Sequence, residues 1–187
     1  MTVDGDAIEP DGKDWTWVLQ RPCPDCGFDA SAIRREDVPD HIRRDGAAWV
    51  DRLGSADVGA RPAPTVWSVL EYGCHVRDVH RIFEHRVQLM LTEDDPLFPN
   101  WDQDETAIVD DYASQVPVTV AGELLAAATT VADTYAGVSG DRWSRRGLRS
   151  NGSEFTVGSI ALYHLHDIVH HAWDVTRQHQ EAAQDRH

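Results

Sequence analysis

Four segments of the chain carry apolar residues at the spacing of an α-helix, and this periodicity constrains the fold more than any other feature. In the last segment, Val157, Ile160, Ala161, Leu165 and Ile168 recur every three or four residues and would form one buried stripe. The four segments extend over residues 35–53, 66–91, 118–138 and 156–178. Helices of this length and number predict an all-α protein, a four-helix bundle with a crossover connection.

Turn residues place the boundaries of these helices. Thr65 is a suitable N-cap for the second helix, and Gly54 closes the first. A short helical piece is expected near residues 107–113, whereas the arginine-bearing stretch before the last helix shows no convincing β-hairpin signal. A chain of 187 residues can bury the core of one domain. We therefore expect one helical domain over residues 35–180 and a C-terminal tail at 181–187.

Residues 1–34 do not follow the helical pattern. Residues 1–14 are acidic and lack apolar periodicity, which predicts a frayed tail. In residues 15–30, two prolines and Gly27 exclude a regular helix, while two tryptophans need a surface to pack against. We expect this second part to lie as an ordered, non-helical strap across the bundle.

Composition excludes several classes of partner. The formal net charge of −15 argues against nucleic acid and against an anionic membrane surface. No stretch approaches the ~20 consecutive apolar residues of a membrane span, and the acidic opening lacks the features of a secretory signal. Three cysteines are too few for a disulfide scaffold. We expect a cytoplasmic protein without nucleic-acid or membrane partners, and a homodimer is left open.

The chain has ten histidines, and the last expected helix concentrates them in the sequence YHLHDIVHHAWDV. Residues four apart share a helix face, so His166 and His170 can present two imidazoles to one ion. A stable site needs a third ligand from another element, and the second helix offers His75, His80 and His85. We select His75, because position 80 falls on the apolar stripe of that helix and fits a core histidine.

These positions resemble the DinB-like (damage-inducible) superfamily of four-helix-bundle metalloproteins, near its thiol-dependent S-transferases and mycothiol-dependent maleylpyruvate isomerases. Family members carry a tryptophan and an E-x-x-x-H-x-x-D pattern on the second helix, and an H-x-x-x-H pair on the last. The matching residues are Trp67, Glu71, His75, Asp78, His166 and His170. The resemblance covers roughly residues 35–180. It implies one divalent ion, zinc or nickel, held by His75, His166 and His170.

The register of the pair on the last helix stays open by one residue. His171 with Asp167 is the competing pair, and Asp167 could instead be an acceptor that orients an imidazole. His164 and His171 lie on a different helix face from the family-like pair, so one ion cannot easily use members of both sets. Without a metal, all these histidines would be surface or core side chains.

Cys23 and Cys26 form a C-x-x-C motif outside the family's core pattern. The motif is compatible with half of a structural zinc site, with a redox pair, or with two thiols that have no role. A closed zinc site would have to recruit a distant His, Asp or Cys74. Because two further cysteines at the usual spacing are missing, we favour thiols without a role. Cys74 neighbours His75 but points about 100° away from it, and we expect it in the core.

Three histidine ligands leave a divalent ion with an open coordination position, as in catalytic sites. The pattern contains no obvious nucleophile. We therefore expect a second molecule to supply the nucleophile. The resemblance implies a low-molecular-weight thiol, mycothiol if the source is an actinobacterium, for transfer to an electrophile or for an isomerisation. Arg145 and Arg149 could contact an anionic group of this cosubstrate, or lie in a solvated loop. The rival hypotheses are a non-catalytic metal- or ligand-binding bundle and a metal-dependent hydrolase.

Overall fold

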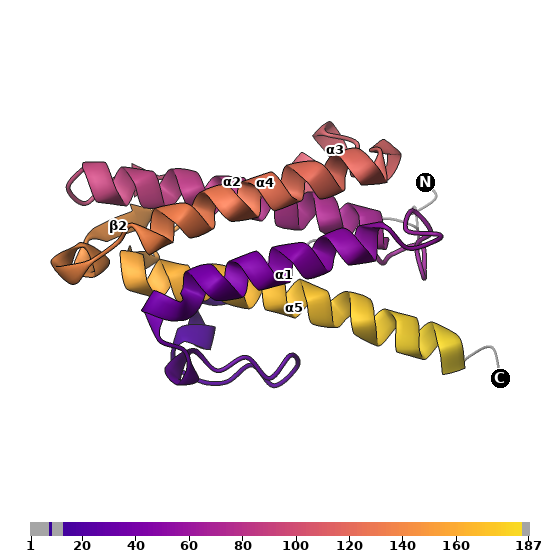
Figure 1. Cartoon of the computed structure of the whole chain (residues 1–187), viewed down its shortest axis with the longest axis horizontal. Coiled ribbons are helices and arrows are strands. Elements are labelled where there is room, and N and C mark those ends of the chain that lie inside the picture. Colours follow the sequence, from indigo (N-terminus) through magenta and orange to yellow (C-terminus); the bar gives the residue numbers. More distant parts are fainter. Residues whose placement is uncertain (1–7, 9–12, 185–187) are drawn as a thin grey trace, which may run out of the picture.

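The structure is a computed structural model that describes residue 8 and residues 13–184, with side chains described as far as residue 177. The four long helices are α1 (Val38–Leu53), α2 (Val69–Thr92), α4 (Pro117–Ala136) and α5 (Val157–Gln184). Helix α4 packs against α1 and α2, and α5 packs against the other side of both, which closes the bundle (Figure 1). The expected four-helix bundle is confirmed. Each helix lies within a few residues of its expected place, except that α5 ends at Gln184 rather than near residue 178.

The two expected tails lie only partly within the described residues. The expected N-terminal tail falls mostly on residues 1–7 and 9–12, which lie outside the described residues. At the other end, α5 continues to Gln184, beyond the expected start of the C-terminal tail, and residues 185–187 again lie outside the described part.

The N-terminus of α2 is fixed by a capping box. The Ser68 hydroxyl accepts a hydrogen bond from the Glu71 backbone N–H at 3.2 Å, and the Glu71 carboxylate accepts one from the Ser68 backbone N–H at 2.8 Å. The N-cap expected at Thr65 is therefore wrong, because the reciprocal bonds that satisfy first-turn donors form only at Ser68. Arg61 donates to the same carboxylate and ties the preceding loop to the helix.

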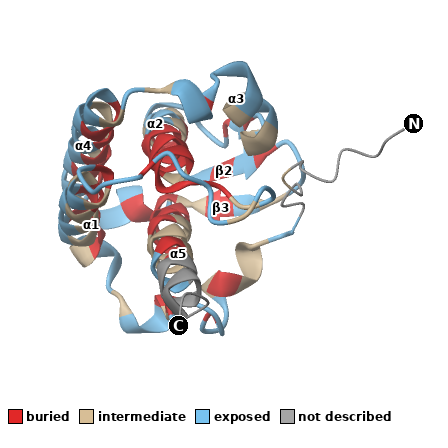
Figure 2. Cartoon of the chain, turned by 90° about the vertical axis from the view of Figure 1, so that its right-hand side faces the viewer, coloured by how far each residue is buried: buried red, intermediate tan, exposed pale blue. Residues whose placement is uncertain are grey.

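A small sheet lies beside α2 and α5 (Figure 2). Strand β1 (Leu97–Phe98) pairs in parallel with β2 (Arg146–Arg149), which pairs antiparallel with β3 (Glu154–Thr156). The expectation that no hairpin precedes α5 is wrong. The turn contains Asn151 and Gly152, and Gly152 has a φ of +93°, a conformation that glycine adopts without steric cost.

The connection between α2 and α4 carries a short helix, α3 (Gln103–Val109), followed by a 3₁₀ turn at Tyr112–Ser114. The short helical piece was expected a few residues later, near 107–113. The Asp102 side chain accepts from the backbone N–H groups of Asp104 and Glu105, which starts the helix early.

The core between α2 and α5 contains polar side chains as well as apolar ones. His80 Nδ1 lies 3.0 Å from His164 Nε2, and the Tyr135 hydroxyl lies 3.3 Å from His164 Nδ1. All three residues are fully buried. Burial lowers the pKa of His80 to about 4, so the imidazole is neutral at pH 7. His80 and His164 are therefore core histidines that pair one ring nitrogen each, while His80 Nε2 is buried without a hydrogen-bond partner.

The segment before α1 packs against α5 through two 3₁₀ turns, η1 (Thr16–Leu19) and η2 (Ala30–Ala32), and is the indigo ribbon of Figure 1. Val18 and Phe28 are its buried apolar anchors. The strap, expected over residues 15–30, thus extends to the end of η2 at residue 32. No helix in the described part of the chain is long and apolar enough to cross a membrane.

Candidate metal centre

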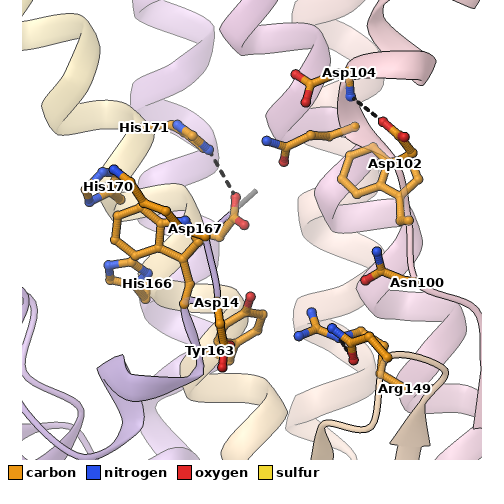
Figure 3. Close-up of a pocket in the computed structure, with 15 residues that line it drawn as sticks. Asp14, Asn100, Asp102, Asp104, Arg149, Tyr163, His166, Asp167, His170 and His171 are labelled. Atoms are coloured by element: carbon orange, nitrogen blue, oxygen red, sulfur yellow. Dashed lines mark hydrogen bonds and ion pairs between the residues drawn. The ribbon is translucent and has the colours of Figure 1, made fainter. Parts of the chain in front are cut away.

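A polar pocket of about 400 Å³ opens between α5, the start of the strap and the segment that leads into α3. Figure 3 shows its two walls: Tyr163, His166, Asp167, His170 and His171 line one wall from α5, and the facing wall carries Asn100, Asp102, Asp104 and Arg149. Trp15 from the strap and Trp101 also line the pocket. The histidine-rich turns of α5 therefore face a cavity rather than bulk solvent.

Potential metal ligands gather in two groups beside this pocket. Within the described residues, the ligand atoms of each group lie within 4.8 Å of one another. One group is His75, Asp167 and His171, and the other is Cys23, Cys26, His166 and His170. We call them the bundle group and the strap group.

The bundle group joins α2 to α5. His75 Nε2 lies 3.5 Å from Asp167 Oδ1, and His171 Nε2 lies 3.6 Å from the same oxygen. The two imidazole rings are perpendicular, with centroids 4.6 Å apart. Trp101 stacks on His75 with an interplanar angle of 7°, and its indole N–H donates to Thr106 on α3. The indole thus fixes the ring of His75 from the pocket side.

The charges in the bundle group suit a cation. Burial lowers the pKa of His75, so its ring is neutral and offers a lone pair. Burial alone would raise the pKa of Asp167, but the His75 and His171 imidazoles outweigh it and hold that carboxyl ionised. Both ring nitrogens of His75 and Asp167 Oδ1 are buried without a hydrogen-bond partner.

The strap group joins the C-x-x-C motif to α5. A tight turn carries the cysteines: the Gly27 backbone N–H donates to the Cys23 carbonyl at 3.0 Å, and Gly27 takes a φ of +73°. Cys23 Sγ lies 3.7 Å from His170 Nδ1. Cys23 and His166 are buried, and His166 Nε2 has no hydrogen-bond partner.

Cys26 does not have the activated thiol of a redox-active C-x-x-C motif. Cys23, Cys26 and Cys74 are free thiols. Burial raises the pKa of Cys26 to about 11, whereas reactive C-x-x-C cysteines have a lowered pKa. Cys74 is fully buried on α2, where its thiol contacts the Tyr112 carbonyl.

The trio expected from the sequence is not brought together. His75 belongs to the bundle group, whereas His166 and His170 belong to the strap group. The pair left open by the sequence, Asp167 with His171, is the one that faces His75. The reason is helix rotation: the faces of neighbouring residues on α5 differ by about 100°, so only one register can point at α2.

Of the two arginines expected to contact the cosubstrate, Arg149 lies at the pocket and Arg145 does not. Arg149 lines the pocket, almost buried, and donates to Asn151 and Ser153. Arg145 instead donates to the Met90 and Glu93 carbonyls at the C-terminus of α2 and is not part of the pocket.

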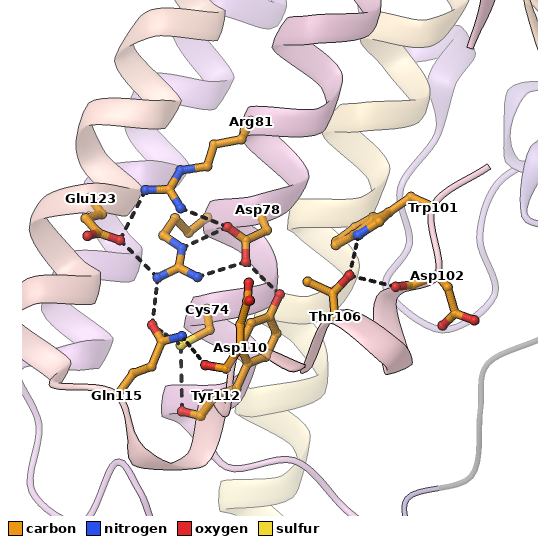
Figure 4. Close-up of polar contacts among 11 residues, drawn as sticks. Cys74, Asp78, Arg81, Trp101, Asp102, Thr106, Asp110, Tyr112, Gln115 and Glu123 are labelled. Carbon is orange, nitrogen blue, oxygen red and sulfur yellow. Dashed lines mark hydrogen bonds and ion pairs between the residues drawn. The ribbon is translucent and has the colours of Figure 1, made fainter. Parts of the chain in front are cut away.

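Glu71 and Asp78 of the family-like pattern have structural roles and belong to neither group of potential metal ligands. Glu71 forms the capping box of α2. Asp78 accepts from the Tyr112 hydroxyl at 2.6 Å and from the Arg77 guanidinium, which binds the segment between α3 and α4 to α2 (Figure 4). Because Asp78 lies one turn after His75, this network also fixes the part of α2 that presents His75.

Two features of the site were not expected from the sequence. A distant His was one of the partners considered for the strap cysteines, but thiols without a role were favoured. Cys23 and Cys26 have the C-x₂-C spacing of zinc sites, and His166 and His170 have the H-x₃-H spacing. Both motifs are visible in the sequence, but most of the chain separates them. Trp101 stacks on His75 from a loop, and nothing in its local sequence indicates that contact.

Comparisons with known proteins agree with the fold. The family model of the DinB superfamily matches residues 40–175. Among solved structures, YfiT from Bacillus subtilis, described as "a probable metal-dependent hydrolase with an unusual four-helix bundle topology", superposes with a TM-score of 0.63 at 17% sequence identity, covering 95% of this chain and 94% of that chain. No curated protein was found that matches the chain. The family model covers well over half of the sequence, and the chain therefore belongs to the DinB superfamily.

Proposed function

We propose that this protein is a metal-dependent S-transferase that binds one divalent ion, zinc or nickel, at His75, Asp167 and His171. Its second molecule is a low-molecular-weight thiol, which it transfers to an electrophile. One observation carries the proposal: Asp167 and His171 of the bundle group line a polar pocket, and His75 meets them from α2. The three ligands leave a coordination position for an exchangeable molecule.

The side chains present fit such an ion. His75 and Asp167 keep buried polar atoms without hydrogen-bond partners, and an unpaired buried polar atom costs about 1–3 kcal/mol. A cation between them would satisfy two of these atoms, His75 Nε2 and Asp167 Oδ1, which belong to a neutral imidazole and an ionised carboxylate. The trio is favoured over His75 with His166 and His170, because those two rings approach the strap cysteines instead.

A supplied nucleophile agrees with the pocket. The described residues that line it include no serine, threonine or cysteine. When bound, a divalent ion would favour the deprotonated form of a thiol or of water near neutral pH. The chain's own contribution is then to bind the reactants, to orient them against the bundle group and to limit access of solvent, which Trp15 and Trp101 do from two sides.

The polar walls favour a thiol that carries hydroxyl groups. Asn100, Gln103 and Asn151 offer amide donors and acceptors, and the carboxylates of Asp102 and Asp104 offer acceptors for sugar-type hydroxyls. Mycothiol, a thiol with sugar hydroxyls, has this chemistry. The guanidinium of Arg149 is available on the same wall for a carboxylate of the electrophile.

Metal-dependent hydrolysis is the second candidate. The solved structure with the same fold is described as a probable metal-dependent hydrolase, and the same trio would support attack by water. The two reactions differ in one requirement, since only the transferase consumes an added thiol.

The test is a thiol-consumption assay on the metal-loaded protein with mycothiol and a chlorodinitrobenzene electrophile. We expect turnover that needs both the metal and the thiol, and that falls at least a hundredfold in His75→Ala and in His171→Ala. His85→Ala is the matched control, because His85 is an exposed histidine of the same helix. Ester hydrolysis without thiol would establish the hydrolase instead, and no turnover with either would leave the non-catalytic bundle.

A further inference from the structure

We infer that the protein holds a second, structural zinc ion, bound by Cys23, Cys26, His166 and His170. This ion fastens the strap to α5, independently of the activity proposed for the bundle group. Four protein ligands fill a tetrahedral coordination shell, which is the signature of a closed zinc site rather than a catalytic one.

The positions of the four side chains match this coordination. Zinc bonds of about 2.3 Å to sulfur and about 2.0 Å to nitrogen place tetrahedral S and N ligands roughly 3.5 Å apart. Cys23 Sγ and His170 Nδ1 are 3.7 Å apart without any ion between them. The remaining ligand atoms lie within 4.8 Å of one another, so small side-chain rotations complete the shell.

The local backbone is built for the same purpose. Gly27, with its positive φ, turns the chain so that both cysteines face α5, and the Cys23 backbone N–H donates to the Phe28 carbonyl at 2.8 Å. On α5 the two histidines are four residues apart and their rings lie with centroids at 5.2 Å. The motif therefore combines a C-x₂-C turn with an H-x₃-H helix.

Neighbouring side chains enclose and orient the group. Trp15 packs against both imidazoles, with ring centroids 5.5 Å from His166 and 4.9 Å from His170, and Phe28 meets the edge of His166. Asp174 Oδ2 lies 3.9 Å from His170 Nε2, on the side of the ring away from Cys23. A carboxylate behind a metal-binding imidazole is the usual outer partner in zinc sites.

The strap needs such a fastening. Between η1 and η2 it has no regular helix or strand, and few buried apolar side chains hold it on α5. An ion bound by side chains of both the cysteine turn and α5 would join the two segments directly. The site would also set the rotation of α5, on which Asp167 and His171 of the bundle group follow His166 and His170 by one residue.

Metal analysis separates the two sites. We expect about two ions per chain in the wild type, and about one in Cys23→Ser/Cys26→Ser and in His166→Ala. Cys74→Ser is the matched control, because its buried thiol belongs to neither group, and it should keep both ions. His171→Ala should lose only the ion of the bundle group. An unchanged metal count in the double cysteine variant would overturn the inference.

Cobalt loading provides a readout on the unmodified protein, which covers the case of a variant that fails to fold. Cobalt in the strap group gives thiolate-to-metal charge-transfer bands, whereas the bundle group has no sulfur ligand. We expect these bands in the wild type and in His171→Ala, together with protection of Cys23 and Cys26 from a thiol reagent until a chelator is added. Absent bands with freely reactive thiols would show that the strap binds no metal. Failure of the transferase assay would leave this result untouched.

Discussion

His170 and His171 are adjacent in the sequence, yet their imidazole rings lie 6.0 Å apart at an angle of 81° and face different groups of ligands. His170 faces Cys23 of the strap, and His171 faces His75 of α2. Successive residues of a helix are rotated by about 100°. The pair His166 and His170 and the pair Asp167 and His171 therefore lie on two neighbouring faces of α5. Asp174 Oδ2 lies 3.1 Å from His171 Nδ1 and 3.9 Å from His170 Nε2, and thus stands behind both rings.

Replacing Asp174 should weaken metal binding without removing a ligand. The carboxylate accepts from His171 Nδ1, which directs Nε2 towards Asp167 and the ring towards His75. In Asp174→Asn we expect metal affinity of the bundle group to fall roughly tenfold to a hundredfold, as for other outer partners of metal-binding histidines. Chelator competition measures the affinity. Asp51→Asn, at an exposed position on α1, is the control, and an equal loss there would contradict the assignment.

Arg149 should govern the binding of an anionic reactant. Its guanidinium lies on the pocket wall, almost buried, over the rings of Phe155 and Tyr163, which pack against each other. Arg149→Lys keeps the charge but loses the planar fork, so we expect the KM for a carboxylate-bearing electrophile to rise roughly tenfold or more, with a smaller change in kcat. Arg145→Lys is the control, since Arg145 caps α2 outside the pocket. A rise in KM in Arg145→Lys but not in Arg149→Lys would refute this role.

The helices could be predicted from the sequence because their signal is periodic and local. The stripe of α5, with Ile160, Leu165 and Ile168, is visible in the residues and is buried in the structure. Helix ends were harder to predict. Ser68 and Thr65 are both acceptable N-caps by residue type. The Ser-x-x-Glu spacing of Ser68 and Glu71, which form the reciprocal bonds, distinguishes Ser68, and the expectation of Thr65 overlooked it.

The site depended on contacts that a local pattern does not contain. The sequence supplied His75 and both candidate pairs on α5, but the choice between them rests on the rotation of α5 about its axis. A rotation of about 100° exchanges one pair for the other. Asp167 and His171 border the apolar stripe, whereas His166 and His170 lie on the opposite face of α5, where the strap packs. The strap cysteines approach His166 and His170 from the other end of the sequence, so tertiary packing sets this contact.

Close packing of α1 on α4 gives a stability test. A Cβ on Gly46 would lie 2.8 Å from the Cβ of Ala128, while a Cβ on Gly122 would meet nothing within 4 Å. Gly46→Ala should therefore destabilise the bundle by about 1–3 kcal/mol through overpacking. Gly122→Ala should stabilise it by about 0.5–1 kcal/mol, since alanine is the better helix former. Urea unfolding of both variants measures the difference, and equal effects would mean that α1 and α4 do not approach closely at Gly46.

The buried histidines predict that the metal-free protein loses stability in mild acid. Burial holds the pKa of His80 at about 4, below its usual value of about 6.5. Above pH 6.5 the ring is neutral in both the folded and the unfolded chain, so the full stability is present. As the pH falls from 6.5 towards 4, the unfolded chain takes up a proton that the folded chain resists, and stability is lost. The limit for this one group is about 3 kcal/mol.

His80→Gln isolates that contribution, because an amide at this position does not titrate and can still reach His164. Urea unfolding in the presence of a chelator, at about pH 7 and about pH 4.5, gives the loss of free energy of unfolding for each protein. We expect the loss to be about 2 kcal/mol smaller in His80→Gln than in the wild type, and unchanged in His85→Gln, whose histidine is exposed. His164 adds to the wild-type loss in the same direction, since burial lowers its pKa as well. The same loss in the wild type and in His80→Gln would show that His80 accepts a proton inside the folded bundle.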